Sequence, residues 1–102
     1  MRPAANTRPV AERTRLVLLV GGDDETAKAV ARASTPLPVV RAKIAAHATE
    51  RLRAMRPLAV VIAADVPKED AAELRRAARA QAAAWIEADG DLQQVAEVVR
   101  RR

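Results

Sequence analysis

The stretch that decides the fold of this chain is Arg15-Leu16-Val17-Leu18-Leu19-Val20-Gly21-Gly22-Asp23-Asp24-Glu25-Thr26. It holds an apolar run rich in valine and leucine, two glycines, and then a group of acids. A continuous apolar run that ends at glycine is typical of a strand buried on both faces, as the central strands of parallel sheets are. The acids suit a helix N-terminus, where free N–H groups and the helix dipole favour negative charge. The stretch therefore predicts a central strand that leads through a glycine turn into a helix.

The rest of the chain repeats this alternation of strand and helix. A second continuous apolar run at 58–64 predicts the other central strand, and weaker patterns predict strands at 39–44 and 83–87. Helical periodicity predicts helices at 24–34, 45–56, 67–80 and 91–102, the last of them capped by Asp91. Four β-α units in succession indicate an α/β fold with three layers, because right-handed crossovers place helices on both faces of a parallel sheet. We predict a four-stranded sheet in the order 2-1-3-4.

The side-chain pattern also predicts which faces are buried. Arg41 and Lys43, at alternate positions, suit an edge strand. Helical spacing predicts the buried positions of the four helices: Ala27, Val30 and Ala31 in the first, Ile44, Ala48, Leu52 and Met55 in the second, Ala71, Leu74 and Ala78 in the third, and Leu92, Val95, Ala96 and Val99 in the last.

Length and composition limit the remaining possibilities. The 102 residues suffice for one domain at 15–102, preceded by a flexible N-terminal tail at 1–14 that contains Pro3 and Pro9. With one aromatic residue, Trp85, and many alanines, the core should be thin and aliphatic. The absence of cysteine excludes disulfides, thiol catalysis and cysteine metal ligands. No apolar run approaches the roughly 18 residues that span a membrane, so we expect a cytoplasmic protein that does not enter a membrane.

Three segments resemble the receiver domain of two-component response regulators. Val17-Leu18-Leu19-Val20 and the acidic turn after it are similar to the family's first strand and turn. The run from Arg56 to Pro67 is similar to its third strand, and the run from Trp85 to Arg102 is similar to its last strand and helix. The resemblance covers 15–102 and implies a flavodoxin-like fold, shortened by one β-α unit because receivers have five strands.

The departures from the receiver pattern bear on function. The resemblance puts Gly21 and Gly22 at the metal-binding acid pair, Ala63 at the phosphoacceptor aspartate and Ala88 at the conserved lysine. Phosphoryl transfer to an aspartate needs a carboxylate nucleophile and a metal ion, and alanine supplies neither. The resemblance therefore implies a pseudo-receiver that is not phosphorylated in the usual way and is not an enzyme.

The turn after the first strand is the candidate ligand site. Its residues, together with the acid after the second apolar run, are Gly21, Gly22, Asp23, Asp24, Glu25 and Asp65. The carboxylates could converge on a divalent cation, and the glycines could cradle a phosphate at the helix N-terminus. The structural alternative is that the first three acids stabilise the helix N-terminus and Asp65 lies in a loop. We favour this alternative and expect no cofactor or bound metal.

The last strand is the candidate interface. Its apolar residues include Trp85 and Ile86, and an exposed apolar edge tends to be covered or paired. We therefore expect a two-fold homodimer through the last strand and helix. The alternative is that Trp85 packs under the last helix against Leu92 and Val95.

The leading hypothesis for function is a non-catalytic protein–protein interaction module in signalling. The first alternative is a domain that binds a small ligand or a divalent metal at the glycine turn. The second is a nucleic-acid accessory protein, since the net charge is +5 and the chain could form a basic face from arginines of the second and third helices: Arg51, Arg53, Arg56, Arg75, Arg76 and Arg79.

Overall fold

The computed structural model describes residues 14–90 and 92–101. Strands and helices alternate along this part of the chain: β1 Thr14–Val20, α1 Asp24–Ser34, β2 Val39–Ala42, α2 Ala45–Met55, β3 Pro57–Ile62, α3 Lys68–Ala80, β4 Ala84–Glu87 and α4 Gln93–Arg101. The alternation predicted from the sequence is confirmed.

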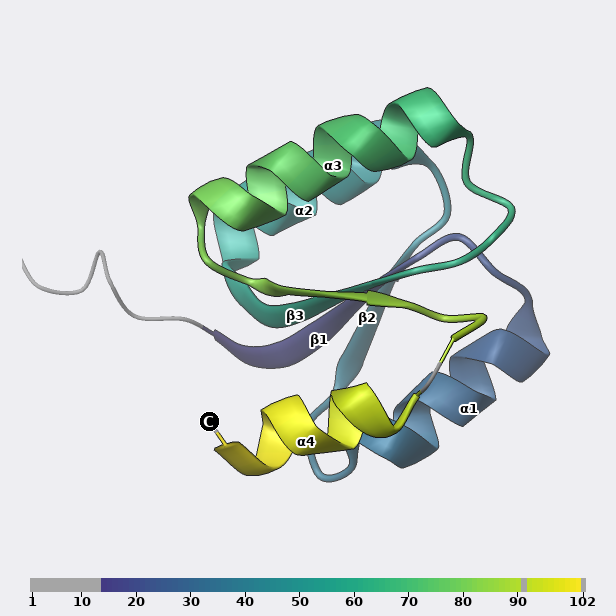
Figure 1. Cartoon of the computed structure of the whole chain (residues 1–102), viewed down its shortest axis with the longest axis vertical. Helices are drawn as coiled ribbons and strands as arrows, with labels where there is room; N and C mark the ends of the chain where they lie inside the picture. The colour runs from purple at the N-terminus through teal and green to yellow at the C-terminus, as the bar shows by residue number, and fades with distance from the viewer. Residues whose placement is uncertain (1–13, 91, 102) are drawn as a thin grey trace, which may run out of the picture.

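The strands form one parallel sheet in the order β2-β1-β3-β4. This is the predicted order, with the two continuous apolar strands inside and the strand that carries Arg41 at one edge. Helices α2 and α3 lie together on one face of the sheet, and α1 and α4 lie together on the other (Figure 1). The predicted three-layer α/β fold is therefore confirmed.

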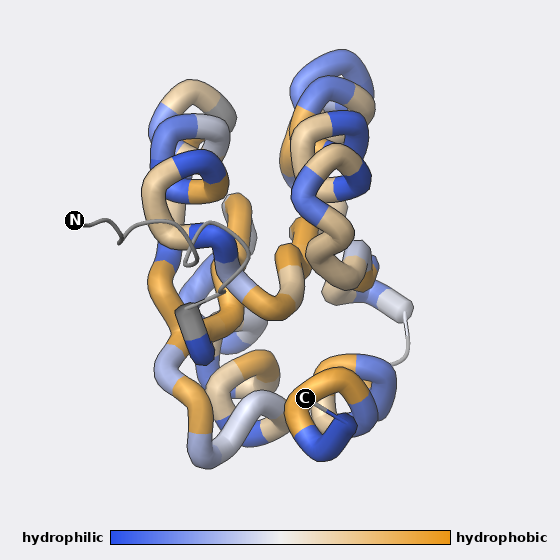
Figure 2. The backbone as a smooth tube through the Cα atoms, turned by 90° about the vertical axis from the view of Figure 1, so that its left-hand side faces the viewer, coloured by the Kyte–Doolittle hydropathy of each residue, from blue (hydrophilic) through white to orange (hydrophobic). Residues whose placement is uncertain are grey.

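The central strands are buried on both faces because their side chains alternate between two core clusters. Leu18 and Val20 pack with residues of α2 and α3, whereas Val17 and Leu19 pack with Val30 of α1 and with α4. Figure 2 shows the hydrophobic strand segments enclosed between the helix layers. The buried hydrophobic residues are aliphatic, as predicted from the composition.

Some predicted boundaries were wrong. The second strand ends at Ala42 rather than residue 44, so Ile44 precedes α2 as its N-cap residue and is 53% exposed. The third strand ends at Ile62, two residues before the predicted end. Thr14, assigned to the tail, is the first residue of β1. The predicted cap Asp91 and residues 1–13 lie outside the described residues.

The buried face of α1 also differs from the prediction. Ala27 and Val30 face the sheet, but Ala31 is exposed. Ser34 occupies the next buried position, and its hydroxyl donates to the carbonyls of Ala31 and Leu37. The internal hydrogen bonds allow a polar residue to take a core-facing position.

Helix α3 ends in a Schellman motif that has alanine where glycine is usual. Ala83 N–H donates to the Ala78 carbonyl at 2.9 Å, and Ala82 N–H donates to the Arg79 carbonyl at 3.0 Å. Ala82 has a φ of 58°, in the left-handed region. The motif turns the chain from the helix layer back into β4.

This geometry predicts that Ala82→Gly stabilises the domain. Relief of the left-handed strain, about 1–2 kcal/mol, exceeds the entropy that glycine adds to the unfolded chain, about 0.5–1 kcal/mol. We expect the free energy of unfolding to rise by about 0.5–1 kcal/mol, as measured by urea denaturation. The matched control is Ala80→Gly within the same helix end, which should lower it. Equal effects of the two substitutions would contradict this account.

Candidate functional site

The turn after β1 is built on two residues with left-handed backbone conformation. Gly21 and Gly22 have φ values of 76° and 85°. The turn is tied to both neighbouring strands, because Gly21 N–H donates to the Ala42 carbonyl at 2.9 Å and Ala63 N–H donates to the Val20 carbonyl at 3.0 Å. It therefore lies at the carboxyl end of the sheet, where ligands of open α/β folds bind.

Asp65 reaches this turn from the loop after β3. Gly22 N–H donates to Asp65 Oδ1 at 3.0 Å and to Oδ2 at 3.3 Å. The structure thus brings together three of the predicted site residues, Gly21, Gly22 and Asp65. The Asp65 carboxylate thus links the loop after β3 to the turn after β1.

Asp23 and Asp24, which follow the glycines, bond to Thr26 and Arg41. Asp23 is the N-cap of α1, and its Oδ1 accepts from the backbone N–H and the hydroxyl of Thr26 at 2.8 and 2.9 Å. The backbone hydrogen bond from Thr26, followed by the bond from its hydroxyl, lowers the pKa of Asp23. Asp24, mostly exposed, forms an ion pair with Arg41 at 3.1 Å. Within residues 14–90 and 92–101, no group of three or more metal-ligating side chains is present.

Arg41 has a role at this turn that the sequence reasoning missed. From edge strand β2, its Nη1 donates to Asp24 Oδ1 and its Nη2 donates to the Gly22 carbonyl at 3.3 Å. The sequence indicated only that a charge here protects the sheet edge. Pairing of Leu19 with Arg41 in the sheet register is what places the guanidinium beside the turn.

The positions singled out by the receiver resemblance meet at this end of the sheet. A Cβ atom built on Gly22 would lie 3.3 Å from the Ala63 Cβ. Ala88 N–H donates to the Ile62 carbonyl at 2.8 Å, next to Ala63 in the chain. The side chains at these positions are hydrogen or methyl, so none of them supplies a nucleophile, a cation or a metal ligand.

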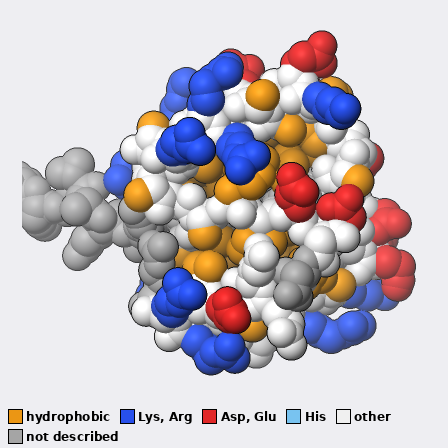
Figure 3. All heavy atoms as spheres, viewed as in Figure 1, with side chains coloured by type: hydrophobic (Ala, Val, Ile, Leu, Met, Phe, Trp, Pro, Cys, Tyr) orange, Lys and Arg blue, Asp and Glu red, His pale blue; other side chains and the backbone are white. Residues whose placement is uncertain are grey.

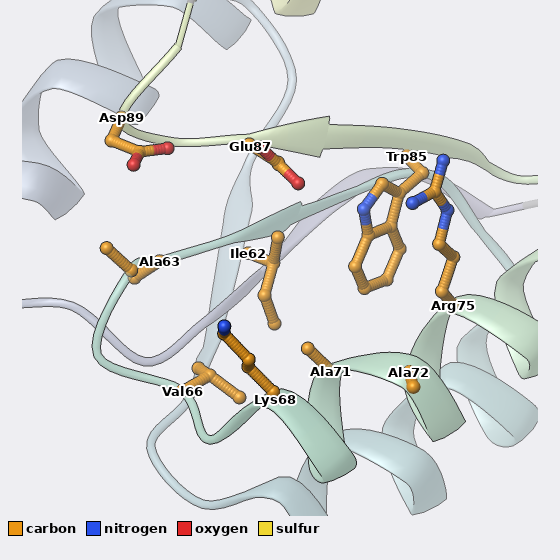
Figure 4. A pocket seen from close by; sticks show the side chains of 11 residues that line it. Ile62, Ala63, Val66, Lys68, Ala71, Ala72, Arg75, Trp85, Glu87 and Asp89 are labelled. Carbon is orange, nitrogen blue, oxygen red and sulfur yellow. The ribbon is translucent and has the colours of Figure 1, made fainter.

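A second candidate site is a hollow of about 460 Å³ between α3 and β4. Its apolar floor includes Ile62 and Trp85, and Figure 3 shows hydrophobic side chains between basic and acidic ones in this region. The basic residues come from α3 and the acidic ones from β4 and the turn after it: Lys68, Arg75, Glu87 and Asp89. Figure 4 shows Trp85 and Glu87 both projecting toward this hollow.

Trp85 does not pack under the last helix, so that alternative was wrong. It packs against the cluster that contains residues of α2 and α3, whereas its neighbour Ile86 packs against the α4 side. Alternation along the strand sends the two side chains to opposite faces. The Arg75 guanidinium carbon lies 6.0 Å from the Trp85 ring centroid. The indole N–H is buried and has no hydrogen-bond partner among the described residues.

The sequence matches no protein-family model and no curated protein. In the described part of the chain, no helix is both long and apolar enough to cross a bilayer.

Proposed function

We propose that this chain is a non-catalytic protein–protein interaction module with a receiver-like fold, acting in cytoplasmic signalling. The observation that carries the proposal is the outer edge of β4 beside the Trp85 hollow. Within the described residues, β4 pairs only with β3, so one side of the strand is open for pairing. Tryptophan is among the residues most enriched at interface hot spots, and here it is only half-buried.

The turn after β1 supports a role without catalysis. Phosphoryl transfer would require a carboxylate where Ala63 stands and acids where Gly21 and Gly22 stand. Asp65, whose carboxylate lies at the glycine turn, already accepts the Gly22 N–H. Asp23 and Asp24 already serve the fold, because Oδ1 of Asp23 caps α1 through Thr26 and Oδ1 of Asp24 pairs with Arg41.

Two alternatives remain as secondary proposals. The hollow beside Trp85 lies near the carboxyl ends of β3 and β4, which favours it over the glycine turn as a place for a small ligand. The arginines of α2 and α3 lie on neighbouring helices, which favours contact with an anionic partner such as nucleic acid. Nucleic-acid binding would weaken steeply as salt rises.

Capture of binding proteins with immobilised variants tests the interaction proposal. We expect a protein that is retained by the wild type and by Ile44→Ala, and lost with Trp85→Ala. Ile44 is a control because it is also a large apolar side chain with exposed surface, but it lies at the start of α2, away from β4. A set of bound proteins unchanged by Trp85→Ala would contradict the proposal.

Treatment with an acyl phosphate donor and magnesium tests the lack of catalysis. We expect no change in the intact mass of the chain. A stable increase by one phosphoryl group, mapped to an aspartate, would show that the domain is phosphorylated after all.

A further inference from the structure

We infer that the occupant of the open β4 edge is a second copy of this chain, bound by antiparallel β4–β4 pairing about a two-fold axis. Ile86 of each copy would lie at the axis, and Trp85 would lie opposite Glu87 of the second copy. The inference rests on the proposed function and names its partner. It follows from the backbone, the side-chain faces and the charges of β4.

The backbone of β4 has hydrogen-bonding groups available at its outer edge. Ala88 N–H donates inward to Ile62, and the N–H and C=O groups of successive strand residues alternate in direction. The groups of Ile86 therefore point toward β3, and those of Trp85 and Glu87 point outward. Trp85 of one copy and Glu87 of the other can therefore exchange a closely spaced pair of hydrogen bonds, and the two-fold axis repeats that pair on its other side. The Glu87 carbonyl also accepts from Gly90 N–H at 3.0 Å and retains a second lone pair.

Side-chain faces limit the register to two choices. Trp85 and Glu87 face the α3 side, and Ala84, Ile86 and Ala88 face the α4 side. Opposed residues of an antiparallel pair share a face. For the eight-stranded sheet to keep its helix layers and for Trp85 to pair within β4, Trp85 must therefore oppose either Trp85 or Glu87 of the second copy.

Ala83 decides between these registers. Opposing two Trp85 residues would pair Glu87 with Ala83, whose N–H already donates to the Ala78 carbonyl at the end of α3. Opposing Trp85 and Glu87 uses only N–H groups that point outward from the sheet. The second register is therefore the one that the backbone favours.

Charge complementarity supports the same register. Arg75 lies over the Trp85 ring, at the basic rim of the hollow, and Glu87 lies at its acidic rim. The two-fold axis places Glu87 of each copy beside Trp85 and Arg75 of the other. That carboxylate would supply an ion-pair partner for Arg75.

Sedimentation of the full chain at micromolar concentrations tests the pairing. We expect a dimer, weakened by about tenfold or more in Glu87→Arg, because like charges would then face each other across the axis. Combining Glu87→Arg with Arg75→Glu should restore it. Glu73→Arg, an equal charge change on the exposed surface of α3 away from the hollow, should leave the dimer intact. Melting temperatures of all variants show that each one is folded.

Disulfide cross-linking tests the register, since the natural chain has no cysteine. In this register Ala84 opposes Ala88 of the second copy in a non-hydrogen-bonded pair, with Cα atoms about 4.5 Å apart, within the disulfide range of about 4.4–6.8 Å. An oxidised mixture of Ala84→Cys and Ala88→Cys chains should yield a covalent dimer. Neither variant alone should form a covalent dimer, because the same position in the two copies is offset by four residues along the paired strands, about 13 Å.

The outcomes separate this inference from the proposed function. A monomer at all concentrations would overturn self-pairing but leave the Trp85-dependent capture of another protein as a separate result. A dimer unaffected by Glu87→Arg, or one that fails to cross-link in the mixture, would overturn the β4 register. If the wild-type chain neither forms a dimer nor captures a protein through Trp85, the interaction function is overturned as well.

Discussion

Replacing Leu18 with alanine should lower the free energy of unfolding by about 2–5 kcal/mol. Leu18 has no exposed surface and lies in the middle of β1, the strand that contacts both β2 and β3. The loss combines the transfer free energy of the removed carbons with the cavity that they leave. It is a large share of the roughly 5–15 kcal/mol that typically keeps a domain folded. Urea denaturation followed by far-UV circular dichroism measures it.

Ile44→Ala is the control for Leu18→Ala. It removes a side chain of similar volume, but that side chain is 53% exposed. We expect a change within about 0.5 kcal/mol. This pair also tests the exposure of Ile44, because the sequence pattern had placed that residue on the buried face of α2. Equal losses from the two substitutions would contradict the burial seen in the structure.

Gly21→Ala should lower the free energy of unfolding by about 2–4 kcal/mol, which combines backbone strain and overpacking. The φ of 76° is unfavourable for any residue with a Cβ atom. A Cβ here would lie 2.7 Å from Asp65 Oδ1 and 2.8 Å from Val66 Cγ2, so the β3 loop would have to move. The displaced carboxylate would also lose its hydrogen bond from Gly22. Urea denaturation gives the size of the loss.

Gly90→Ala is the matched control for this substitution. The nearest atom to a Cβ at Gly90 is the Glu87 carbonyl oxygen at 3.4 Å, an ordinary contact, and the residue lies outside the left-handed region. We expect a change of less than about 1 kcal/mol. If Gly21→Ala were as mild as this control, the glycine turn would be adaptable, and its conformation would not be a requirement of the fold.

The fold was predictable because hydrophobic pattern and topology rules act together. The continuous apolar runs around Val17 and Val60 can be buried only between two helix layers, and right-handed crossovers leave few arrangements for four β-α units. The errors fell where the pattern is weak. Ile44 and Ala31 are apolar residues near or within helices, and their exposure depends on how each helix is rotated against the sheet.

The candidate site was predictable only in part. The chain order placed Gly21, Gly22 and Asp65 after central strands, and these residues do meet. The role of Asp23 at the N-terminus of α1 was predicted, and its bond to Thr26 confirms it. The partners of Asp24 and Trp85 were not settled by spacing. Asp24 pairs with Arg41 because β2 lies beside β1, and Trp85 faces α3 because of the side-chain alternation set by the β3–β4 register.

The sequence by itself determined the order of elements and the central position of β1 and β3. These depend on local composition and on periodicity, which are properties of neighbouring residues in the chain. Only the tertiary structure decided that Asp65 bonds to Gly22 and that Trp85 and Glu87 of β4 line one hollow with Arg75 of α3. Contacts between residues distant in the chain depend on strand register and helix rotation. Both are selected by the free energy of packing the whole core.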